Sequence, residues 1–279
     1  MSSLTLEGAS AWAKIPQLPP DVEQAAAEAL IEFLKEVLSA VEKAMDKGQV
    51  ALEDLHEIYD FKRFKPEWMP FILATLGVGE VRVTLHKGLV KIEETGVPAL
   101  WRMQMGDNES FVLSRIPLCV RRAALEGDEE IGKIVNAGPD VFAAQAILEE
   151  LRNGLKDVRW KTLPEDPAFM VELTHQPMSP GDSRALLSTL GTGDIDVEIQ
   201  GFAKTEIQRT QVKGLWHSRL YNNAGKTLLD AYVTAYIPPE VAAPYESFGD
   251  AKAKCTDLIE WLQGDLDRGV IGTKEAKDA

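Results

Sequence analysis

The hydrophobic pattern of the chain begins with helical spacing. Between residues 21 and 47, apolar residues recur every three or four positions, which is typical of a helix with one buried face. Asp21 follows two prolines and can cap this helix, and Lys47-Gly48 is expected to end it. The stretch from Val50 to Tyr59 predicts a second, shorter helix. The apolar residues of the first helix are Ala25, Ala29, Phe33, Val37, Ala40 and Ala44.

A segment that begins at Pro66 is echoed by one that begins at Pro180. PEWMPFILATLGVGEVRVTL aligns without gaps to PGDSRALLSTLGTGDIDVEI, and one inserted residue then continues the match. About twelve identities in some 36 positions exceed the roughly two expected by chance from average composition. Duplication is the simplest interpretation. The identical pairs are Pro66/Pro180, Leu73/Leu187, Thr75/Thr189, Leu76/Leu190, Gly77/Gly191, Gly79/Gly193, Val83/Val197, Ile92/Ile207, Thr95/Thr210, Val97/Val212, Leu100/Leu215 and Trp101/Trp216.

Each copy predicts one helix followed by antiparallel strands. Ser179 can cap the second helix, with Asp182 three residues on as in a capping box, and both helices are expected to stop at Gly-x-Gly. Beyond the glycines, apolar and polar residues alternate, so one face of each sheet should be buried and the other solvated. Further strands are expected over 90–95, 98–105, 110–116, 203–209, 212–221 and 227–236.

Helical spacing returns between the copies, from Pro139 to Leu155, and again after Pro238-Pro239. The predicted fold class is therefore α+β: two tandem pseudo-symmetric repeats, each a helix plus an antiparallel sheet, with an N-terminal helical arm and a C-terminal helix. The predicted division is an arm over 1–65, a first repeat over 66–125, a helical connection over 126–174, and a second repeat with the C-terminal helix over 175–279.

Composition narrows the classes of partner. The formal charge of −14 disfavours nucleic acid and anionic lipid, so partners should be neutral or basic. No stretch approaches the roughly 18–20 apolar residues of a membrane span, and Met1 to Pro20 shows no basic region followed by an apolar run. The only cysteines are Cys119 and Cys255, so no disulfide framework is expected. These features predict a cytoplasmic protein.

Motifs for catalysis or cofactor binding are not recognisable. The four histidines are isolated in sequence, without HExxH or CxxC spacing, so no metal site is expected. The Gly-x-Gly pairs follow a helix, whereas a nucleotide-binding loop precedes one, so they are interpreted as helix caps and no cofactor is expected. Carboxylates are so abundant that a solvated acidic surface explains them. The pattern favours a binding or assembly protein over an enzyme.

Trp101 and Trp216 occupy matched positions on the third strand of each copy. Core packing is the favoured interpretation, because large aromatic residues on half-buried strands normally fill the layer between sheet and helix. If exposed, they would be binding anchors.

The second copy and its surroundings, HQPMSPGDSRALLSTLGTGDIDVEIQGF and GLWHSRLYNNAGKTLLDAYVTAYIPPEVAAP, resemble the C-terminal region of the HupH/HyaF/HoxQ hydrogenase-expression proteins. The first copy, TLGVGEVRV and IEETGVPALWRMQ, is similar to an earlier segment of that family. Together the resemblance covers about 66–125 and 170–262. The family often carries Cys then Arg in G-[FY]-G-x-C-R, where this chain has Ala203, Thr205 and Glu206, so no thiol-dependent role is expected there.

The resemblance implies an accessory chaperone for a membrane-bound uptake [NiFe]-hydrogenase. Its implied partner is the iron–sulfur small-subunit precursor before twin-arginine export, including the signal peptide, and it implies a thioredoxin-like co-chaperone. Two alternatives stay open: a scaffold for the large subunit, and a metal- or thiol-dependent cofactor-assembly enzyme in which Cys119, His175 and His217 converge. No residue is assigned as catalytic, cofactor-binding or metal-binding. The candidate partner-binding residues are Trp101, Arg102, Trp216, His217 and Tyr221.

Overall fold

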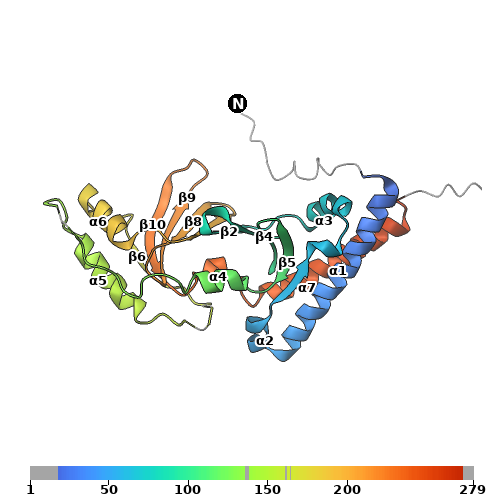
Figure 1. Ribbon diagram of the computed structural model, residues 1–279, viewed down its shortest axis with the longest axis horizontal. Coiled ribbons are helices and arrows are strands. Elements are labelled where there is room, and N and C mark those ends of the chain that lie inside the picture. The colour runs from blue at the N-terminus through green and yellow to red at the C-terminus, as the bar shows by residue number, and fades with distance from the viewer. Residues whose placement is uncertain (1–17, 136–137, 161, 164, 273–279) are drawn as a thin grey trace, which may run out of the picture.

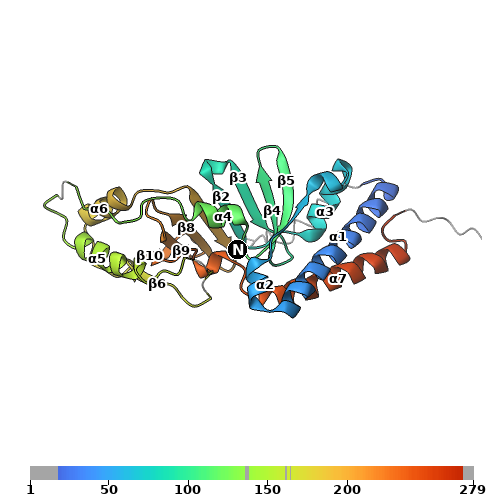
Figure 2. The ribbon, with the colours of Figure 1, turned by 60° about the horizontal axis from the view of Figure 1, so that its bottom comes forward.

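A computed structural model describes residues 18–135, 138–160, 162–163 and 165–272. These residues form one antiparallel sheet of ten strands, with most helices gathered at its two ends and the short helix over Leu118–Ala123 between them (Figures 1 and 2). The α+β class is confirmed. The helices are α1 (Pro20–Lys47), α2 (Gln49–Asp54), α3 (Met69–Leu76), α4 (Leu118–Ala123), α5 (Ala144–Leu155), α6 (Pro180–Leu190) and α7 (Ser247–Asp267). The strands are β1 (Glu57–Asp60), β2 (Val81–Leu85), β3 (Val90–Glu94), β4 (Leu100–Met105), β5 (Asn108–Leu113), β6 (Phe169–Glu172), β7 (Ile195–Gln200), β8 (Lys204–Arg209), β9 (Leu215–Tyr221) and β10 (Thr227–Thr234).

The sheet is continuous across the two sequence copies. Its strand order is β1-β5-β4-β3-β2-β7-β8-β9-β10-β6, so the first strand of one copy pairs with the first strand of the other. At this junction Val83 lies directly opposite Val197, and the pairs Val81↔Ile199 and Leu85↔Ile195 flank it. The two sheets expected from the sequence are therefore a single sheet, joined by antiparallel pairing of β2 with β7.

Corresponding hydrogen bonds recur in the two halves. The helix α3 ends where the Gly77 amide donates to the Leu73 carbonyl at 3.0 Å, and α6 ends with the same bond at 2.9 Å. Both capping glycines have positive φ, which a residue with a Cβ adopts at a cost. The α6 bond runs from Gly191 to Leu187, and the other matching bonds run from Gly79 to Glu94, Gly193 to Arg209, Thr95 to Val97 and Thr210 to Val212.

Two faces of the sheet differ in chemistry. One, which we call the apolar face, carries Val83, Trp101, Val197 and Trp216 in one hydrophobic cluster. It is covered by α4, by residues 236–242 and by Leu163. The described residues cover the opposite face, which we call the polar face, only at its ends. Helices α1, α3 and α7 pack over β4 and β5 at one end, and α5 and α6 pack over β9 and β10 at the other.

Three local predictions need correction. Residues 57–60 form the edge strand β1 rather than part of a second helix, because they pair with β5 and Tyr59 packs on Phe33 at 5.2 Å between rings. The strand β6 lies in the stretch expected to be a helical connection and extends the sheet beside β10. Asp21 does not cap α1, since the helix begins at Pro20 and has no side-chain cap.

The sequence pattern did not predict the short helix α4, but the other main helices and strands lie in the stretches where they were expected. The predicted capping box is present: the Asp182 amide donates to Ser179 Oγ at 2.9 Å, and the Ser179 amide donates to Asp182 Oδ2 at 3.0 Å. The domain boundaries expected at residues 66, 126 and 175 stay predictions. Residues 1–17 of the arm and 273–279 of the second repeat lie outside the described residues.

Candidate partner-binding face

In the part of the chain that the structure describes, the middle of the polar face is open between the two groups of helices. Side chains of β2, β3, β4, β7, β8 and β9 alternate, so every second residue of each strand points to this face. Their neighbours in sequence are the buried residues of the apolar face. A hollow of about 310 Å³ lies here, over β2, β7, β8 and β9. Its polar lining is Arg82, Thr84, Asp196, Glu198, Glu206, Gln208 and Arg219.

Charged residues form a row across this face at right angles to the strands. Arg82 on β2 lies between Glu93 on β3, at 3.4 Å, and Glu198 on β7, at 3.9 Å. On β8, Glu206 follows, and Arg219 on β9 lies 3.2 Å from it. Register places these residues directly opposite one another, which is the geometry in which cross-strand charges interact.

Two carboxylates that would repel each other, Glu198 and Glu206, are adjacent in the row. Lys204 lies 2.9 Å from one and 3.0 Å from the other. Hydrogen bonds from Lys204 hold the pKa of both carboxyl groups below its usual value, and the same bonds raise the pKa of Lys204. All three side chains are about one-third exposed or more, so these ion pairs contribute little to the stability of the fold. The same exposure leaves the three side chains accessible to charged groups of another protein.

The structure places Trp101 and Trp216 away from this face. Both are fully buried in the core of the apolar face. The indole Nε1 of Trp101 donates to the Ser114 carbonyl at 2.9 Å, and that of Trp216 donates to the Ala235 carbonyl at 3.0 Å. Including them among the partner-binding residues was wrong for this folded state, because a partner cannot reach a fully buried indole. Core packing, the interpretation favoured for both, is what the structure shows.

The other three candidates, Arg102, His217 and Tyr221, lie on the polar face. Arg102 on β4 makes an ion pair with Glu109 at 2.6 Å. His217 stacks on Tyr232 with ring centroids 4.6 Å apart, and its Nε2 lies 2.7 Å from Asp230 Oδ1. Tyr221 donates its hydroxyl to Glu206 at 3.3 Å. The structure thus brings Tyr221 into the charged row and leaves Arg102 and His217 toward its two ends.

Sequence reasoning did not single out the central residues of the row. Arg82, Glu198 and Arg219 are ordinary polar positions of alternating strands, and their only signal was that alternation. Their proximity depends on the pairing of β2 with β7, which joins residues more than 100 positions apart.

Comparison with known proteins shows a similarity to hydrogenase expression proteins. A family model described as the HupH hydrogenase expression protein, C-terminal conserved region, matches residues 141–262. Hydrogenase expression/formation protein HupH of Rhizobium leguminosarum bv. viciae is 26% identical over 231 residues, covering 79% of this chain and 77% of that protein. The chain is thus similar, over most of its length, to proteins of the HupH/HyaF/HoxQ family.

Two further relatives extend over most of the chain. Hydrogenase expression/formation protein HoxQ of Cupriavidus necator is 26% identical over 254 residues, covering 88% of this chain and 86% of its own. Hydrogenase-1 operon protein HyaF of Escherichia coli K12 is 25% identical over 250 residues, covering 84% and 80%. The HupH family model contains β7 to β10 and therefore half of the polar face, including His217 and Tyr221.

The structure does not bring Cys119, His175 and His217 together. Cys119 belongs to the core of the apolar face, where its Sγ lies 3.7 Å from Met103 Sδ. His217 lies on the polar face, so the sheet separates the two side chains. His175 is exposed and contacts Glu172 at 2.8 Å. The converging site expected for a metal- or thiol-dependent enzyme is contradicted for these three residues.

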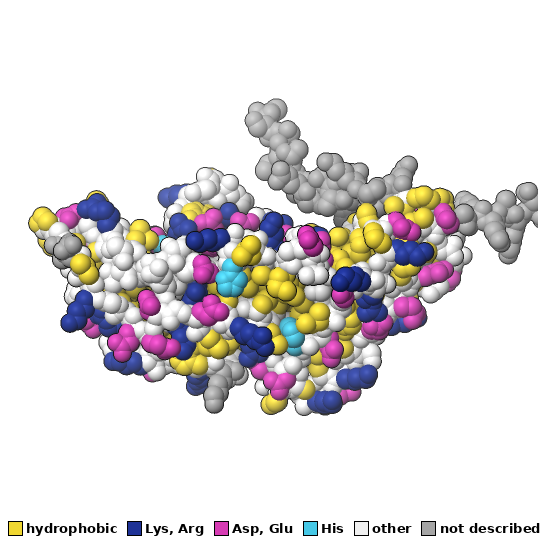
Figure 3. Space-filling view, viewed as in Figure 1, with side chains coloured by type: hydrophobic (Ala, Val, Ile, Leu, Met, Phe, Trp, Pro, Cys, Tyr) yellow, Lys and Arg dark blue, Asp and Glu magenta, His cyan; other side chains and the backbone are white. Residues whose placement is uncertain are grey.

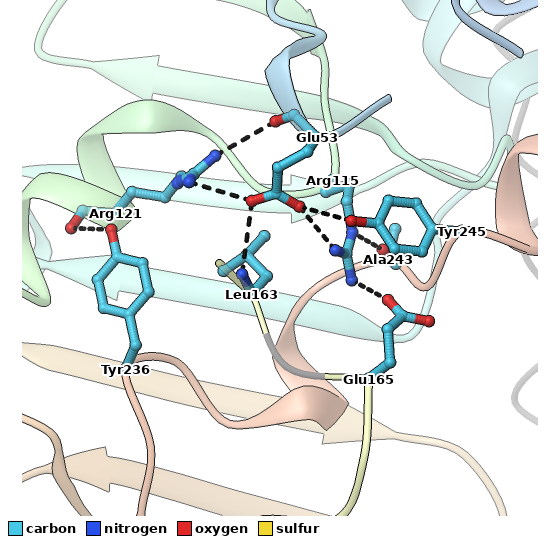
Figure 4. Close-up of polar contacts among 8 residues, drawn as sticks. All are labelled: Glu53, Arg115, Arg121, Leu163, Glu165, Tyr236, Ala243 and Tyr245. Atoms are coloured by element: carbon cyan, nitrogen blue, oxygen red, sulfur yellow. Dashed lines mark hydrogen bonds and ion pairs between the residues drawn. The ribbon is translucent and has the colours of Figure 1, made fainter. Parts of the chain in front are cut away.

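A buried ion network lies outside the polar face (Figure 4). Arg115 is 2% exposed and pairs with Glu53 at 2.8 Å and with Glu165, while its Nε donates to the Ala243 carbonyl at 2.9 Å. The guanidinium carbon also lies 4.1 Å from the centroid of the Tyr245 ring. These contacts join α2, the chain before α4, the chain before β6 and the chain before α7. The paired charges of this buried network are typical of a cluster that stabilises the fold.

Within residues 18–272, apart from the undescribed positions, no helix is both long and apolar enough to cross a membrane.

Proposed function

We propose that this chain is an accessory protein in the maturation of a membrane-bound uptake [NiFe]-hydrogenase, and that it acts in the cytoplasm by binding rather than by catalysis. The observation that carries this proposal is the match to proteins named for hydrogenase expression and formation, which extends over most of both chains. The open polar face supports it, because a broad exposed surface suits a protein partner better than a small substrate.

The proposed partner is the small-subunit precursor, including its twin-arginine signal peptide. Guanidinium groups bind carboxylates through paired hydrogen bonds, and Asp196, Glu198 and Glu206 line the hollow of the polar face. Lys204 is the present partner of the two glutamates and is 42% exposed. An incoming arginine pair could take the place of Lys204 without uncovering any core residue. A thioredoxin-like co-chaperone remains part of the proposal through the family alone.

The test is a pull-down from hydrogenase-expressing cells with the tagged, full-length chain. The small-subunit precursor is compared with a form that lacks the signal peptide. Capture of the precursor supports the proposal, and loss of capture without the peptide supports recognition of the arginines. Recovery of the large subunit alone would reject the small-subunit assignment in favour of a large-subunit scaffold.

A charge-neutral variant sharpens the test. Glu198→Gln with Glu206→Gln should weaken precursor capture about tenfold, because two carboxylates that pair with arginine are lost. The matched control is Glu149→Gln with Glu150→Gln on α5, which makes the same change in net charge outside the charged row. Equal capture by both double variants would rule out the polar face as the arginine site.

A further inference from the structure

The strand β6 lies at one end of the sheet and has a neighbouring strand on one side only. It pairs with β10 from Phe169, opposite Thr234, to Glu172, opposite Ala231, and no described strand lies beyond it (Figure 2). An edge strand presents unpaired N–H and C=O groups, to which a further strand can be added. The free edge of β6 is therefore a candidate docking site.

The hydrogen bonds of β10 show which residues of β6 face this free edge. The Leu173 amide donates to the Asp230 carbonyl at 2.7 Å, so Leu173 and every second residue before it bond toward β10. On the other side of β10, the Ala235 amide donates to the Gly214 carbonyl at 2.9 Å, which is the alternation that this assignment requires. The intervening residues of β6 therefore point their backbone groups away from β10.

Met170 and Glu172 are these outward-facing residues. The Glu172 carbonyl accepts from Gln176 Nε2 at 2.8 Å. The Met170 amide, the Met170 carbonyl and the Glu172 amide have no hydrogen-bond partner among the described residues. Met170 is 48% exposed and Phe169 is 45% exposed. Open backbone donors and acceptors thus coincide with exposed apolar side chains on one strand.

The middle of this edge carries no charge. Phe169, Met170 and Val171 are apolar, whereas exposed Glu57 and Asp60 bound the strand β1 at the opposite end of the sheet. Charged residues on an edge strand commonly prevent two copies of a protein from pairing. Figure 3 shows acidic and basic side chains interspersed over the α5 end of the face in view, so no field of a single sign covers it. The β6 edge therefore lacks the charges that protect β1.

We propose that a second copy of this chain pairs antiparallel with β6, about a twofold axis at Met170, so that the sheets of the two copies become continuous. In this register Met170 lies opposite its own copy, and its amide and carbonyl bond to the same groups there. Phe169 of each copy lies opposite Val171 of the other, which brings apolar side chains together. Glu172 lies opposite Ala168, whose carbonyl accepts from the Glu172 amide.

The neighbouring registers fit less well. Only shifts by an even number of residues keep outward-facing residues opposite one another. A shift by two places Glu172 opposite Asp166 in one direction and opposite Met170 in the other, and a shift by four opposes two copies of Glu172. Like charges directly opposite each other are destabilising. The register centred on Met170 keeps apolar residues together and acids apart, so the edge is complementary to itself.

The expected dimer is weak and depends on salt. Pairing of two short strands makes a small interface, so we expect reversible association with a Kd of about 10 µM. Each copy carries a formal charge of −14, so long-range repulsion opposes association and salt screens it. Raising the salt concentration from about 50 mM to about 500 mM should tighten dimerisation about threefold. Sedimentation equilibrium of the full chain measures both quantities, and weakening by salt would contradict an uncharged interface.

The twofold axis at Met170 allows a charge-exchange test. Met170→Lys and Met170→Glu should each weaken dimerisation about tenfold, because each places like charges opposite one another. An equimolar mixture of the two variants should dimerise as tightly as the unaltered chain, since a lysine then lies opposite a glutamate. The matched control is Ile58→Lys on the other edge strand, β1, where Ile58 is 58% exposed. It should dimerise as the unaltered chain does.

A chain that stays monomeric at about 100 µM in both salt conditions would overturn the proposed dimer. So would a dimer that Met170→Lys leaves unchanged, or a mixture that does not restore dimerisation once circular dichroism shows that both variants are folded.

The precursor pull-down tests the other possible occupant of the β6 edge, a strand of the partner. If Met170→Lys loses the dimer but captures the precursor as the unaltered chain does, the edge belongs to the second copy. If the unaltered chain is monomeric and Met170→Lys loses capture, the edge belongs to the partner and the proposed dimer is overturned. A dimer that passes the charge-exchange test but captures no hydrogenase subunit would reject the proposed function alone, because the dimer does not depend on it.

Discussion

Asp182 determines where two helices begin. Its side chain is fully buried, and its Oδ1 accepts hydrogen bonds from the amides of Phe142, Ala143 and Ala144 at 2.7 to 2.9 Å, at the start of α5. Its Oδ2 accepts from the Ser179 amide at the start of α6. Burial alone would raise the pKa of Asp182, but these backbone donors outweigh it and hold the pKa well below the usual range.

We predict that Asp182→Ala lowers the free energy of unfolding by about 3 kcal/mol, because it leaves buried amide donors of two helices without an acceptor. Asp182→Asn should cost less, because its remaining oxygen can still accept at α5. Urea unfolding at pH 7, followed by circular dichroism, measures both. An Ala variant as stable as the unaltered chain would contradict the double capping role.

Titration of Asp182 makes the free energy of unfolding depend on pH. Because its pKa is lower in the folded chain than the unfolded value near 3.9, its contribution is complete above about pH 5 and is lost as the pH falls below about 4. The difference in unfolding free energy between the unaltered chain and Asp182→Asn should therefore shrink between pH 5 and pH 3. A difference that stays constant over this range would show that Asp182 does not titrate as inferred.

At the scale of elements, Arg115 joins four segments that are far apart in sequence. Glu53 on α2 accepts from Arg115, from Arg121 at 3.1 Å and from the Tyr245 hydroxyl at 3.1 Å. The Leu163 amide also points to Glu53, at 3.4 Å (Figure 4). The Arg115 side chain is 2% exposed and the Glu53 side chain is 11% exposed. Each carries the opposite charge that offsets the cost of burying the other.

We predict that Arg115→Ala lowers the free energy of unfolding by about 3 to 5 kcal/mol, because a nearly buried carboxylate loses its main partner. Arg121→Ala is the control: it removes a guanidinium from the same glutamate, but at a side chain that is 19% exposed, so its effect should be smaller. Arg115→Met combined with Glu53→Gln should recover much of the loss. Equal losses of unfolding free energy in Arg115→Ala and Arg121→Ala would contradict the stabilising role of the Arg115 network. Chemical denaturation at fixed pH measures all three.

Much of the element order could be predicted from the sequence, because the determining interactions are local. The Gly-x-Gly caps after α3 and α6, the capping box at Ser179 and the alternation in β7 each depend on residues within a few positions. The strand β1 was missed for the opposite reason. Its four residues are a strand only because β5 offers an edge to pair with and Phe33 covers Tyr59.

The candidate site was predicted less well than the fold. Arg102, His217 and Tyr221 were placed on a surface, but Trp101 and Trp216 were included with them although they point the opposite way. One position along a strand reverses the face of a side chain, so neighbours such as Trp216 and His217 have opposite environments. Which face would be covered depended on where the helices packed, and that is not a local property.

At the scale of the whole molecule, both halves share one sheet. The pairing of β2 with β7 buries Val83 and Val197 side by side, with 1% and 3% exposure. Separating the halves would expose two strand edges and the hydrophobic cluster that contains both tryptophans. The halves are therefore expected to unfold together.

We predict a single urea-induced transition in which tryptophan fluorescence and far-ultraviolet circular dichroism coincide. Val197→Ala should lower the free energy of unfolding by about 2 kcal/mol and move both signals together, because it weakens the shared junction. Leu187→Ala on the exposed surface of α6 is the control and should leave the midpoint nearly unchanged. Two separated transitions, or a shift of only one signal, would show that the halves are independent folding units.

The sequence by itself determined the helices and strands whose period, caps and turns are local, the correspondence between residues 66–101 and 180–216, and the family resemblance. Tertiary structure decided the joining of the halves through β2 and β7, the start of α5 at the Asp182 carboxylate, and the burial of Trp101 and Trp216. It also brought Arg82, Glu198 and Arg219 together. The physical reason is that pairing and burial depend on which surfaces meet across long sequence separations, whereas helix and strand periods depend on neighbours along the chain.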